Sequence, residues 1–445
     1  MNSGTVSLEK EKIGKLILHY ALPSVMGLVF YGVQNVIDGI IVGRFIGVEA
    51  LAGVNMMMPM YVVIGMLSIM TGVGNQAVIG ISLGKKDYRK AADALTTGGI
   101  FIFCALSVLA ILSFLFSDTL IGLLGATERL HADAEGYLKG LMLLSPFIGY
   151  MFFSDCMIKI SGHPRFALCI MTSTIIINTL LNLFFVLVCG MGTFGVGLAT
   201  GIAFTLAVIP GFFILFNKRN ELAFQKGRFT PRLLGEMLYN GSSEGLAEFS
   251  AGISLILFNY TLMEYAGPDG VAAFSVINYV FYLGLTVFIG VSDGIVPIIS
   301  YNYGAGRFDR LKQVVFLTLK INLAIGLLIF LFVTFQGGFI ISLFLNDPAV
   351  VRIAENGAAI YVMAFLLSGI NILFSGVYTA IANAKYSLVI SSLRGLVFIV
   401  AGLMVLPVFC GINGVWLTVP LAELGTCLVV YFLYRKTRGI IFNEG

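Results

Sequence analysis

Apolar runs separated by short polar segments follow one another along the whole chain. A helix needs about 20 apolar residues to cross the hydrocarbon core of a bilayer, and several of these runs are longer than that. The pattern predicts twelve membrane-spanning helices, some of them tilted. Their approximate bounds are 16–42, 54–83, 91–116, 134–160, 166–188, 194–216, 236–264, 271–301, 312–335, 352–383, 387–408 and 413–434.

Composition agrees with this pattern. Of the 445 residues, 58% are hydrophobic and 11% are charged, whereas a soluble protein carries roughly a quarter charged residues. The chain is therefore predicted to be an all-α polytopic membrane protein. It contains no G-x-x-x-x-G-K-[ST] phosphate loop and no H-E-x-x-H motif, so we expect no enzyme. No basic stripe with interleaved aromatic residues indicates nucleic acid.

Basic residues lie mainly in the polar segments on one side of the predicted membrane. Examples are "GKKDYRK" (84–90), "NKRNELAFQKGRFTPR" (217–232) and "YRKTR" (434–438). Cytoplasmic loops carry an excess of Lys and Arg. Both termini are therefore predicted to be cytoplasmic, and the protein is predicted to be a multi-pass protein of the cytoplasmic membrane.

The two halves of the sequence resemble each other. A shift of 222 residues, about half of the 445, places "GISLGKKDYRKAADAL" (80–95) over "NYGAGRFDRLKQVVFL" (302–317). Repeats of this size are typical of transporters. We expect a six-helix lobe over 1–216, a cytoplasmic linker over 217–235 and a second six-helix lobe over 236–445. Six spans in each half imply an axis along the membrane normal and suggest alternating access.

The stretch "VFYGVQNVIDGIIVGRFIG" (29–47) places the carboxylate of Asp38 within the first predicted span. A charge at the bilayer centre costs roughly 2.5–3.5 kcal/mol on insertion scales, so it persists where it faces a cavity, a partner or an ion. Gln34 and Asn35 precede Asp38 by about one turn, on one helical face. Burial disfavours a charged carboxylate, so Asp38 is a candidate proton carrier. The alternative is a neutral Asp38 held structurally by Gln34 and Asn35.

Three further polar residues lie in the fifth and sixth predicted spans. Asn178 and Asn182, in "INTLLNLF" (177–184), are four residues apart and share a face, and Thr200 is expected near the start of the sixth span. Their oxygens are suited to complete a cation site beside Asp38 or to hold a proton-bearing Asp38 in two orientations. Interhelical hydrogen bonding, which membrane Asn and Thr commonly provide, is the alternative.

The second half carries its own polar residues within predicted spans. Glu244 and Glu248 share one face of the seventh span, and Glu248 lies deeper in it. Arg394 is expected to pair inside the second lobe. The candidates for polar residues of a substrate cavity are Glu248, Glu244, Asn278, Asp293 and Arg394.

The six cysteines all fall in apolar segments, without the spacing of a metal site or a disulfide framework. We expect them to be buried packing residues. The residues concerned are Cys104, Cys156, Cys169, Cys189, Cys410 and Cys427.

Taken together, these features resemble the multidrug and toxic compound extrusion (MATE) transporters, most closely the bacterial MepA-like branch. The features are two homologous six-span halves, Pro23 and Asp38 in the first span, the Asn178–Asn182 pair followed by "GVGLAT" (195–200), and "SYNYGAGRFDR" (300–310). The resemblance covers essentially the whole chain.

The resemblance implies a secondary antiporter that expels cationic or amphipathic drug-like compounds in exchange for H⁺ or Na⁺. By that resemblance, Asp38, Asn178, Asn182 and Thr200 form the coupling-ion site, with Gln34 and Asn35 beside it. Many relatives carry Asp where this chain has Asn182, which leaves the choice between H⁺ and Na⁺ open. No cofactor is implied, and no metal other than Na⁺ at Asp38. We expect a monomer surrounded by membrane lipid.

There are two alternative functions. The first is a flippase for a lipid-linked glycan precursor, since relatives in the same superfamily move polyprenyl-linked sugars. Such a protein favours a cavity ringed by Arg and Lys, whereas Arg394 is nearly alone here. The second is a passive channel, which needs neither a titratable site nor a two-lobe repeat.

Overall fold

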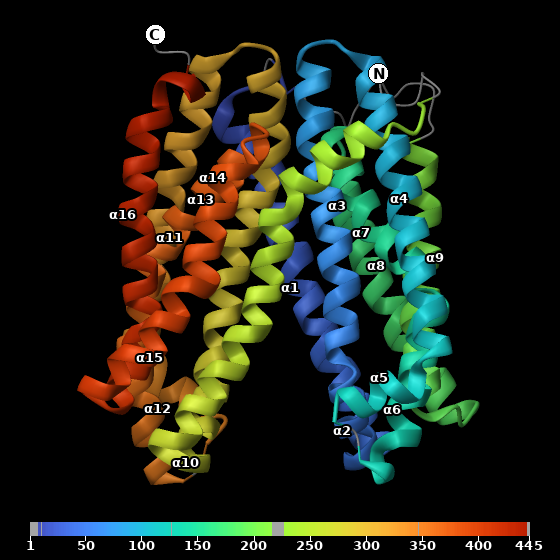
Figure 1. Ribbon diagram of the computed structural model, residues 1–445, viewed down its shortest axis with the longest axis vertical. Coiled ribbons are helices and arrows are strands. Elements are labelled where there is room, and N and C mark those ends of the chain that lie inside the picture. The colour runs from blue at the N-terminus through green and yellow to red at the C-terminus, as the bar shows by residue number, and fades with distance from the viewer. Residues whose placement is uncertain (1–7, 10, 126, 216–226, 346, 443–445) are drawn as a thin grey trace. The chain divides into compact units, whose positions relative to one another are not determined.

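The computed structural model describes residues 8–9, 11–125, 127–215, 227–345 and 347–442, and all regular elements within them are helices (Figure 1). Residues 217–226 of the predicted linker lie outside the described residues. The first half contains α1 (Ile13–Phe45), α2 (Val48–Met56), α3 (Met58–Gly84), α4 (Tyr88–Leu115), α5 (Ser117–Leu123), α6 (Glu128–Leu143), α7 (Ser145–Ile160), α8 (Pro164–Leu183), the π-helical turn η1 (Phe184–Val188) and α9 (Gly192–Leu215). The second half contains α10 (Pro231–Gly304), α11 (Phe308–Ser342), α12 (Pro348–Tyr361), the 3₁₀ turn η2 (Val362–Ala364), α13 (Phe365–Ala380), α14 (Ala384–Ser392), the π-helical turn η3 (Leu393–Val397), α15 (Phe398–Cys410) and α16 (Ile412–Phe442).

Ten of the helices in the described ranges are long and apolar enough to cross a membrane. One of these, α10, joins two helices through non-helical backbone at Gly267. The pair α6 and α7 also qualifies as one span, bent by 54°. When α10 is taken as two spans and the bent pair as one, the total is the predicted twelve. The prediction of an all-α polytopic membrane protein is confirmed.

The structure departs from the predicted spans at three places. The predicted span 134–160 is not one straight helix, because α6 ends at Leu143 and α7 begins at Ser145 with a proline in its first turn. Proline suits a first turn but lacks the N–H that would continue the preceding helix. The short helices α2 and α5 lie largely outside the predicted spans.

By compactness, the chain divides into two units. Unit 1 is built from Met26–Gly245, and unit 2 from Lys12–Val25 together with Leu246–Gly445. Helix α1 therefore passes from unit 2 into unit 1, and α10 passes from unit 1 into unit 2. The predicted lobes 1–216 and 236–445 follow the sequence repeat, whereas the compact units exchange one helical segment each.

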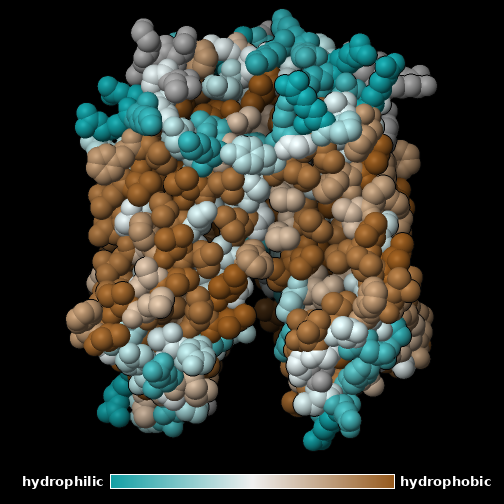
Figure 2. Space-filling model, viewed as in Figure 1, coloured by the Kyte–Doolittle hydropathy of each residue, from teal (hydrophilic) through white to brown (hydrophobic). Residues whose placement is uncertain are grey.

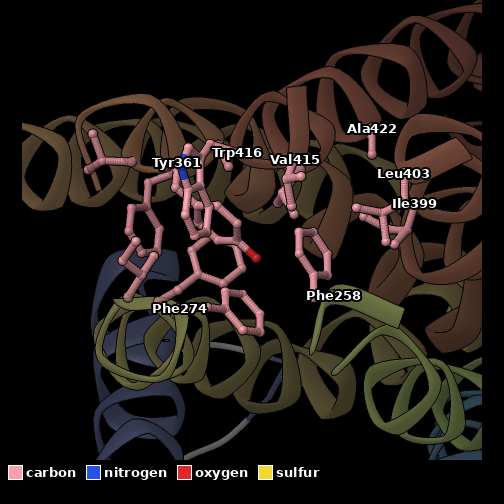
Figure 3. Packing of buried hydrophobic residues seen from close by; sticks show 14 of the residues in the cluster. Phe258, Phe274, Tyr361, Ile399, Leu403, Val415, Trp416 and Ala422 are labelled. Carbon is pink, nitrogen blue, oxygen red and sulfur yellow. The ribbon is translucent and has the colours of Figure 1, made fainter. Parts of the chain in front are cut away.

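Unit 2 has an aromatic core. Phe258 and Phe274 stack with their ring centroids 4.9 Å apart, and Phe274 lies 6.3 Å from the buried Trp416. Tyr361 contacts both phenylalanine rings at an edge-on angle (Figure 3). Offset and edge-on aromatic pairs are favoured over face-to-face sandwiches, so these rings fix how α10, α12 and α16 pack.

The middle of the molecular surface is apolar. Hydrophobic side chains cover the middle of each unit on the face in view, and hydrophilic side chains gather at its two ends (Figure 2). Phe335 and Phe409 are 77% and 79% exposed, which suits contact with lipid tails. Four cysteines are exposed rather than buried, so the expectation of buried packing residues is wrong for them: Cys104, Cys169, Cys189 and Cys410. Their helices turn these positions outward, and an apolar sequence does not distinguish a core from a lipid-facing surface.

We expect Gly267→Ala to destabilise the protein by about 1–2 kcal/mol. Gly267 has φ 62° and ψ −156°, a backbone region that is essentially restricted to glycine. Thermal unfolding in detergent measures the loss. Gly252→Ala, at a position of α10 where a Cβ meets nothing within 4 Å, is the matched control and should not lower the melting temperature. Equal melting temperatures for the two variants would contradict the prediction.

Candidate ion-binding site

A chain of polar side chains joins α1, α8 and α9 within unit 1. Asn182 Nδ2 donates to Asp38 Oδ1 at 2.7 Å and to Asn178 Oδ1 at 3.3 Å. Asn178 Nδ2 in turn donates to Thr200 Oγ1 at 3.2 Å. The structure therefore brings together four residues that the sequence places far apart.

Local helix geometry explains this arrangement. Asn178 and Asn182 are four residues apart in α8, so their amides lie one above the other on a single face. Both are fully buried. Thr200 fixes its hydroxyl by donating to Val196 O, one turn earlier in α9, at 3.2 Å. Directly after Asn182 the helix widens into the π-helical turn η1, a feature that often marks functional sites.

Close packing of α6 against α9 fixes the position of Thr200. A Cβ at Gly197 would lie 2.6 Å from both Leu141 N and Tyr137 O. Gly136, on the facing side of α6, lies against Thr193 and Phe194. Small residues such as these let membrane helices approach to backbone contact. The buried Tyr137 is thereby held within electrostatic reach of Asp38.

Two amide oxygens near this cluster have no hydrogen-bond partner. Among the described residues, Asn182 Oδ1 and Gln34 Oε1 are buried and accept no hydrogen bond. A buried polar atom without a partner is costly, and most such atoms are paired. Asp38 itself makes no ion pair in the part of the chain that the structure describes, and its one hydrogen bond is from Asn182. The site thus offers a carboxylate that can take up a proton, and unused oxygens that can coordinate a hard cation.

The surroundings of Asp38 differ from the sequence-based expectation in two respects. Gln34 is 2% exposed, but Asn35 lies on the exposed side of α1, because neighbouring helical residues point about 100° apart. Within the described residues neither side chain hydrogen-bonds to Asp38, so the alternative of an Asp38 held by Gln34 and Asn35 is wrong. Thr200 lies two turns inside α9 rather than near its start, since the helix begins at Gly192.

The candidate substrate-cavity residues of the second half do not gather at one point. Glu248 is exposed, whereas Glu244, Asn278 and Asp293 are partly buried. Asn278 and Asp293 are fifteen residues apart in the second part of α10, which corresponds to about 22 Å along a helix. The expectation that Arg394 is paired within the C-terminal half is confirmed, because its Nε lies 2.7 Å from Glu423 Oε1.

The sequence interpretation missed an ion pair on α7. Lys159 Nζ lies 2.5 Å from Asp155 Oδ2, and the two side chains are only 7% and 18% exposed. Opposite charges four residues apart on a helix are neighbours, so the spacing was a usable signal. On the facing helix α3, Gln76 Nε2 donates to Cys156 O at 3.0 Å, which ties α3 to the same turn.

Comparison with known proteins agrees with this architecture. The MatE family model matches residues 11–184 and 246–404. Among curated proteins, the multidrug export protein MepA of Staphylococcus saprophyticus is 26% identical over 436 residues, which cover 96% of this chain and 95% of that protein. MepA of Staphylococcus aureus strain MRSA252 is 25% identical over 434 residues, with the same coverage.

Solved structures share the fold. One, described as the outward-facing conformation of a multidrug resistance MATE family transporter of the MOP superfamily, superposes with a TM-score of 0.90 at 21% identity and covers 99% of both chains. A crystal structure of MATE in complex with MaL6 superposes with a TM-score of 0.92 at 20% identity, again over 99% of both chains. At such identities the likeness concerns the fold alone.

Proposed function

Because this multi-pass membrane protein belongs to the MatE family, we propose that it is a secondary active multidrug exporter. It expels cationic or amphipathic drug-like compounds in antiport with H⁺ or Na⁺, by alternating access. The similarity over nearly the whole chain to proteins called multidrug export protein MepA supports this function.

One observation carries the proposal: the Asp38 carboxylate is held by Asn182, whose own Oδ1 remains buried without a partner. A protonated Asp38 has an O–H to donate, and Asn182 Oδ1 is an acceptor on the same amide that holds it. A Na⁺ ion would instead take its oxygens from Asp38, Asn182 and Asn178. In either case the bound cation neutralises a charge that is costly at membrane depth.

This neutralisation supplies the coupling. With its cation bound, the cluster carries no net charge, so the site can switch from facing one side of the membrane to facing the other at a low cost in free energy. The bare carboxylate resists such a switch, because it would have to enter an apolar environment. Loss of the cation on the side where it is scarce then favours the conformation that takes up drug. Thr200 and Asn178 keep the amide of Asn182 oriented throughout.

The proposed orientation in the membrane rests on the distribution of basic residues. The excess of Lys and Arg in the loops that contain 84–90 and 217–232 favours cytoplasmic termini in the cytoplasmic membrane. We propose that the protein works as a monomer. Within unit 2, Glu248 offers an exposed carboxylate for a cationic substrate, and Glu244, Asn278 and Asp293 are further polar candidates.

The experiment that tests this function uses purified wild-type protein in proteoliposomes with the membrane potential clamped. Uptake of a fluorescent lipophilic cation is followed into vesicles that are acidic inside, and separately into vesicles loaded with Na⁺. We expect uptake against the concentration gradient with one of the two ions, which names the coupling ion. Protein-free liposomes and a matching ionophore serve as controls. Uptake that ignores both gradients would contradict the proposal.

A further inference from the structure

Unit 2 contains a second polar cluster at membrane depth, formed by α13, η3 and α16. Arg394 Nε donates to Glu423 Oε1 at 2.7 Å. Asn371 Nδ2 donates to the other carboxylate oxygen, Glu423 Oε2, at 2.6 Å and to Glu423 O at 2.8 Å. The Glu423 side chain is 3% exposed and that of Arg394 is 21% exposed.

This cluster has the parts of a cation site. A buried carboxylate accepts hydrogen bonds from an amide, and Asn371 Oδ1 is buried without a partner among the described residues. The same combination surrounds Asp38 in unit 1, where Asn182 supplies both the donor and the unused oxygen. The difference is that a guanidinium of the chain itself neutralises Glu423.

The repeat shows that two elements of each cluster correspond, the region of α8 with that of η3 and α9 with α16. Gly162 and Ala382 both have positive φ, 89° and 58°, and each lies two residues before its helix, α8 or α14, begins, which gives an offset of 220 between these helices. The stretch "GTFGVGLATG" (192–201) opens α9 and "GINGVWLTVP" (411–420) opens α16, with Gly, Gly, Val and Leu recurring at an offset of 219.

These offsets place Arg394 over Thr174 and Glu423 over Phe204. Thr174 is one turn before Asn178 on the same face of α8, and Phe204 is one turn after Thr200 on the same face of α9. Because α8 and α9 run antiparallel, one turn backward along α8 and one turn forward along α9 lead in the same direction in space. The Arg394–Glu423 cluster therefore occupies the counterpart of the Asp38 cluster, displaced by one helical turn.

The remaining element differs between the units. Asp38 lies 25 residues after the start of α1, and the corresponding stretch of α10, residues 249–263, carries no charged side chain. Unit 2 thus lacks a carboxylate from its first long helix and has one from α16 instead, together with a fixed cation.

We propose that Glu423 and Asn371 form a cation site and that the guanidinium of Arg394 occupies it permanently. Arg394 stands where a monovalent cation would otherwise bind between Glu423 and Asn371. Unit 2 consequently takes up no coupling ion, and each transport cycle exchanges ions through unit 1 alone. This consequence rests on the proposed function, whereas the occupancy of the site by Arg394 does not.

The test measures melting temperature in detergent, in an Asp38→Asn background so that the unit 1 site cannot respond. Arg394→Ala removes the guanidinium, and methylguanidinium is the probe, added at millimolar concentration beside choline as a bulky control cation. We expect Arg394→Ala to lower the melting temperature by roughly 5 °C, because one partner of a buried pair is left alone. Methylguanidinium should restore most of that loss, and Na⁺ a smaller part of it.

Two control variants isolate the site. Adding Glu423→Gln to Arg394→Ala removes the carboxylate and should abolish the response to methylguanidinium. Arg352→Ala removes an arginine from an exposed position on α12 and should give no response. The proposal is overturned if methylguanidinium does not raise the melting temperature of Arg394→Ala. It is also overturned if methylguanidinium still raises the melting temperature after Glu423→Gln is added.

If Arg394→Ala does not fold, Arg394→Lys and Arg394→Met replace it. The lysine keeps a cation beside Glu423, and the methionine keeps comparable bulk without charge. We expect the lysine variant to melt closer to the parent protein. A methionine variant as stable as the lysine variant means that the site needs no cation, and the proposal then fails. Since these readouts require no transport, they stand apart from the test of export.

Discussion

Replacing Asp38 by Asn should abolish concentrative drug uptake while leaving drug binding in place. A tenfold gradient of the coupling ion is worth about 1.4 kcal/mol. With the membrane potential clamped, one-for-one exchange can therefore sustain a drug accumulation ratio of about tenfold for each factor of ten in the ion gradient, and the uncoupled variant should fall to a ratio near one. Asn keeps the shape of the side chain and an Oδ1 that accepts from Asn182, so we expect normal folding.

The measurement is the same proteoliposome assay, with equilibrium binding of the lipophilic cation followed in parallel. Asp118→Asn is the matched control, because Asp118 is 82% exposed and pairs with His131 on the surface. Its accumulation ratio should equal that of the wild type. If Asp38→Asn accumulates drug normally, the carboxylate is structural, and the coupling site must be sought at Glu248 and Asp293.

Replacing Gly197 by Leu should destabilise the protein by about 3 kcal/mol. A Cβ at this position would lie 2.6 Å from backbone atoms of Leu141 and Tyr137, and backbone cannot rotate away as a side chain can. Helices α6 and α9 must therefore separate. That movement carries Thr200 away from Asn178, so binding of the coupling ion should weaken together with stability.

Thermal unfolding in detergent tests this prediction, with Gly65→Ala as the control. Gly65 lies in α3, and a Cβ there meets nothing within 4 Å. Alanine is favoured over glycine in a helix by about 0.5–1 kcal/mol, so the control should melt at the wild-type temperature or slightly above. A Gly197→Leu variant that melts with the wild type would show that α6 and α9 do not pack through this glycine.

Hydropathy predicted the spans well, because a bilayer imposes a minimum length of apolar sequence that any spanning helix must satisfy. It predicted the break between 236–264 and 271–301, where Gly267 has non-helical backbone. It did not predict the bend at Leu144, since such a bend depends on the backbone angles at one residue. Four cysteines illustrate a further limit. Lipid-facing and core positions are equally apolar, so composition alone could not place Cys104 or Cys410 on the outside.

The polar residues were found for a related reason. Asp38, Asn178 and Asn182 stand out against an apolar background, where each must have a partner or a role. Which residues pair is a matter of distance between helices that the sequence does not contain. The pairing of Arg394 was expected, but Glu423 and Asn371 as its companions emerge only when α13 and α16 are packed together. The role of the Asp38 cluster in ion coupling stays a prediction until transport is measured.

The assignment of Lys12–Val25 to unit 2, and of the start of α10 to unit 1, has a consequence for the integrity of the chain. Neither half of the sequence contains a whole compact body. Two separate polypeptides cut at the midpoint would each lack the helical piece that completes them, and each would expose a glycine-lined groove, as at Gly290 and Gly294, which lie against Val25 and Ala21. Each compact unit is completed by a segment from the other half of the sequence, as in a domain-swapped dimer. Such halves should be stable only when they are produced together.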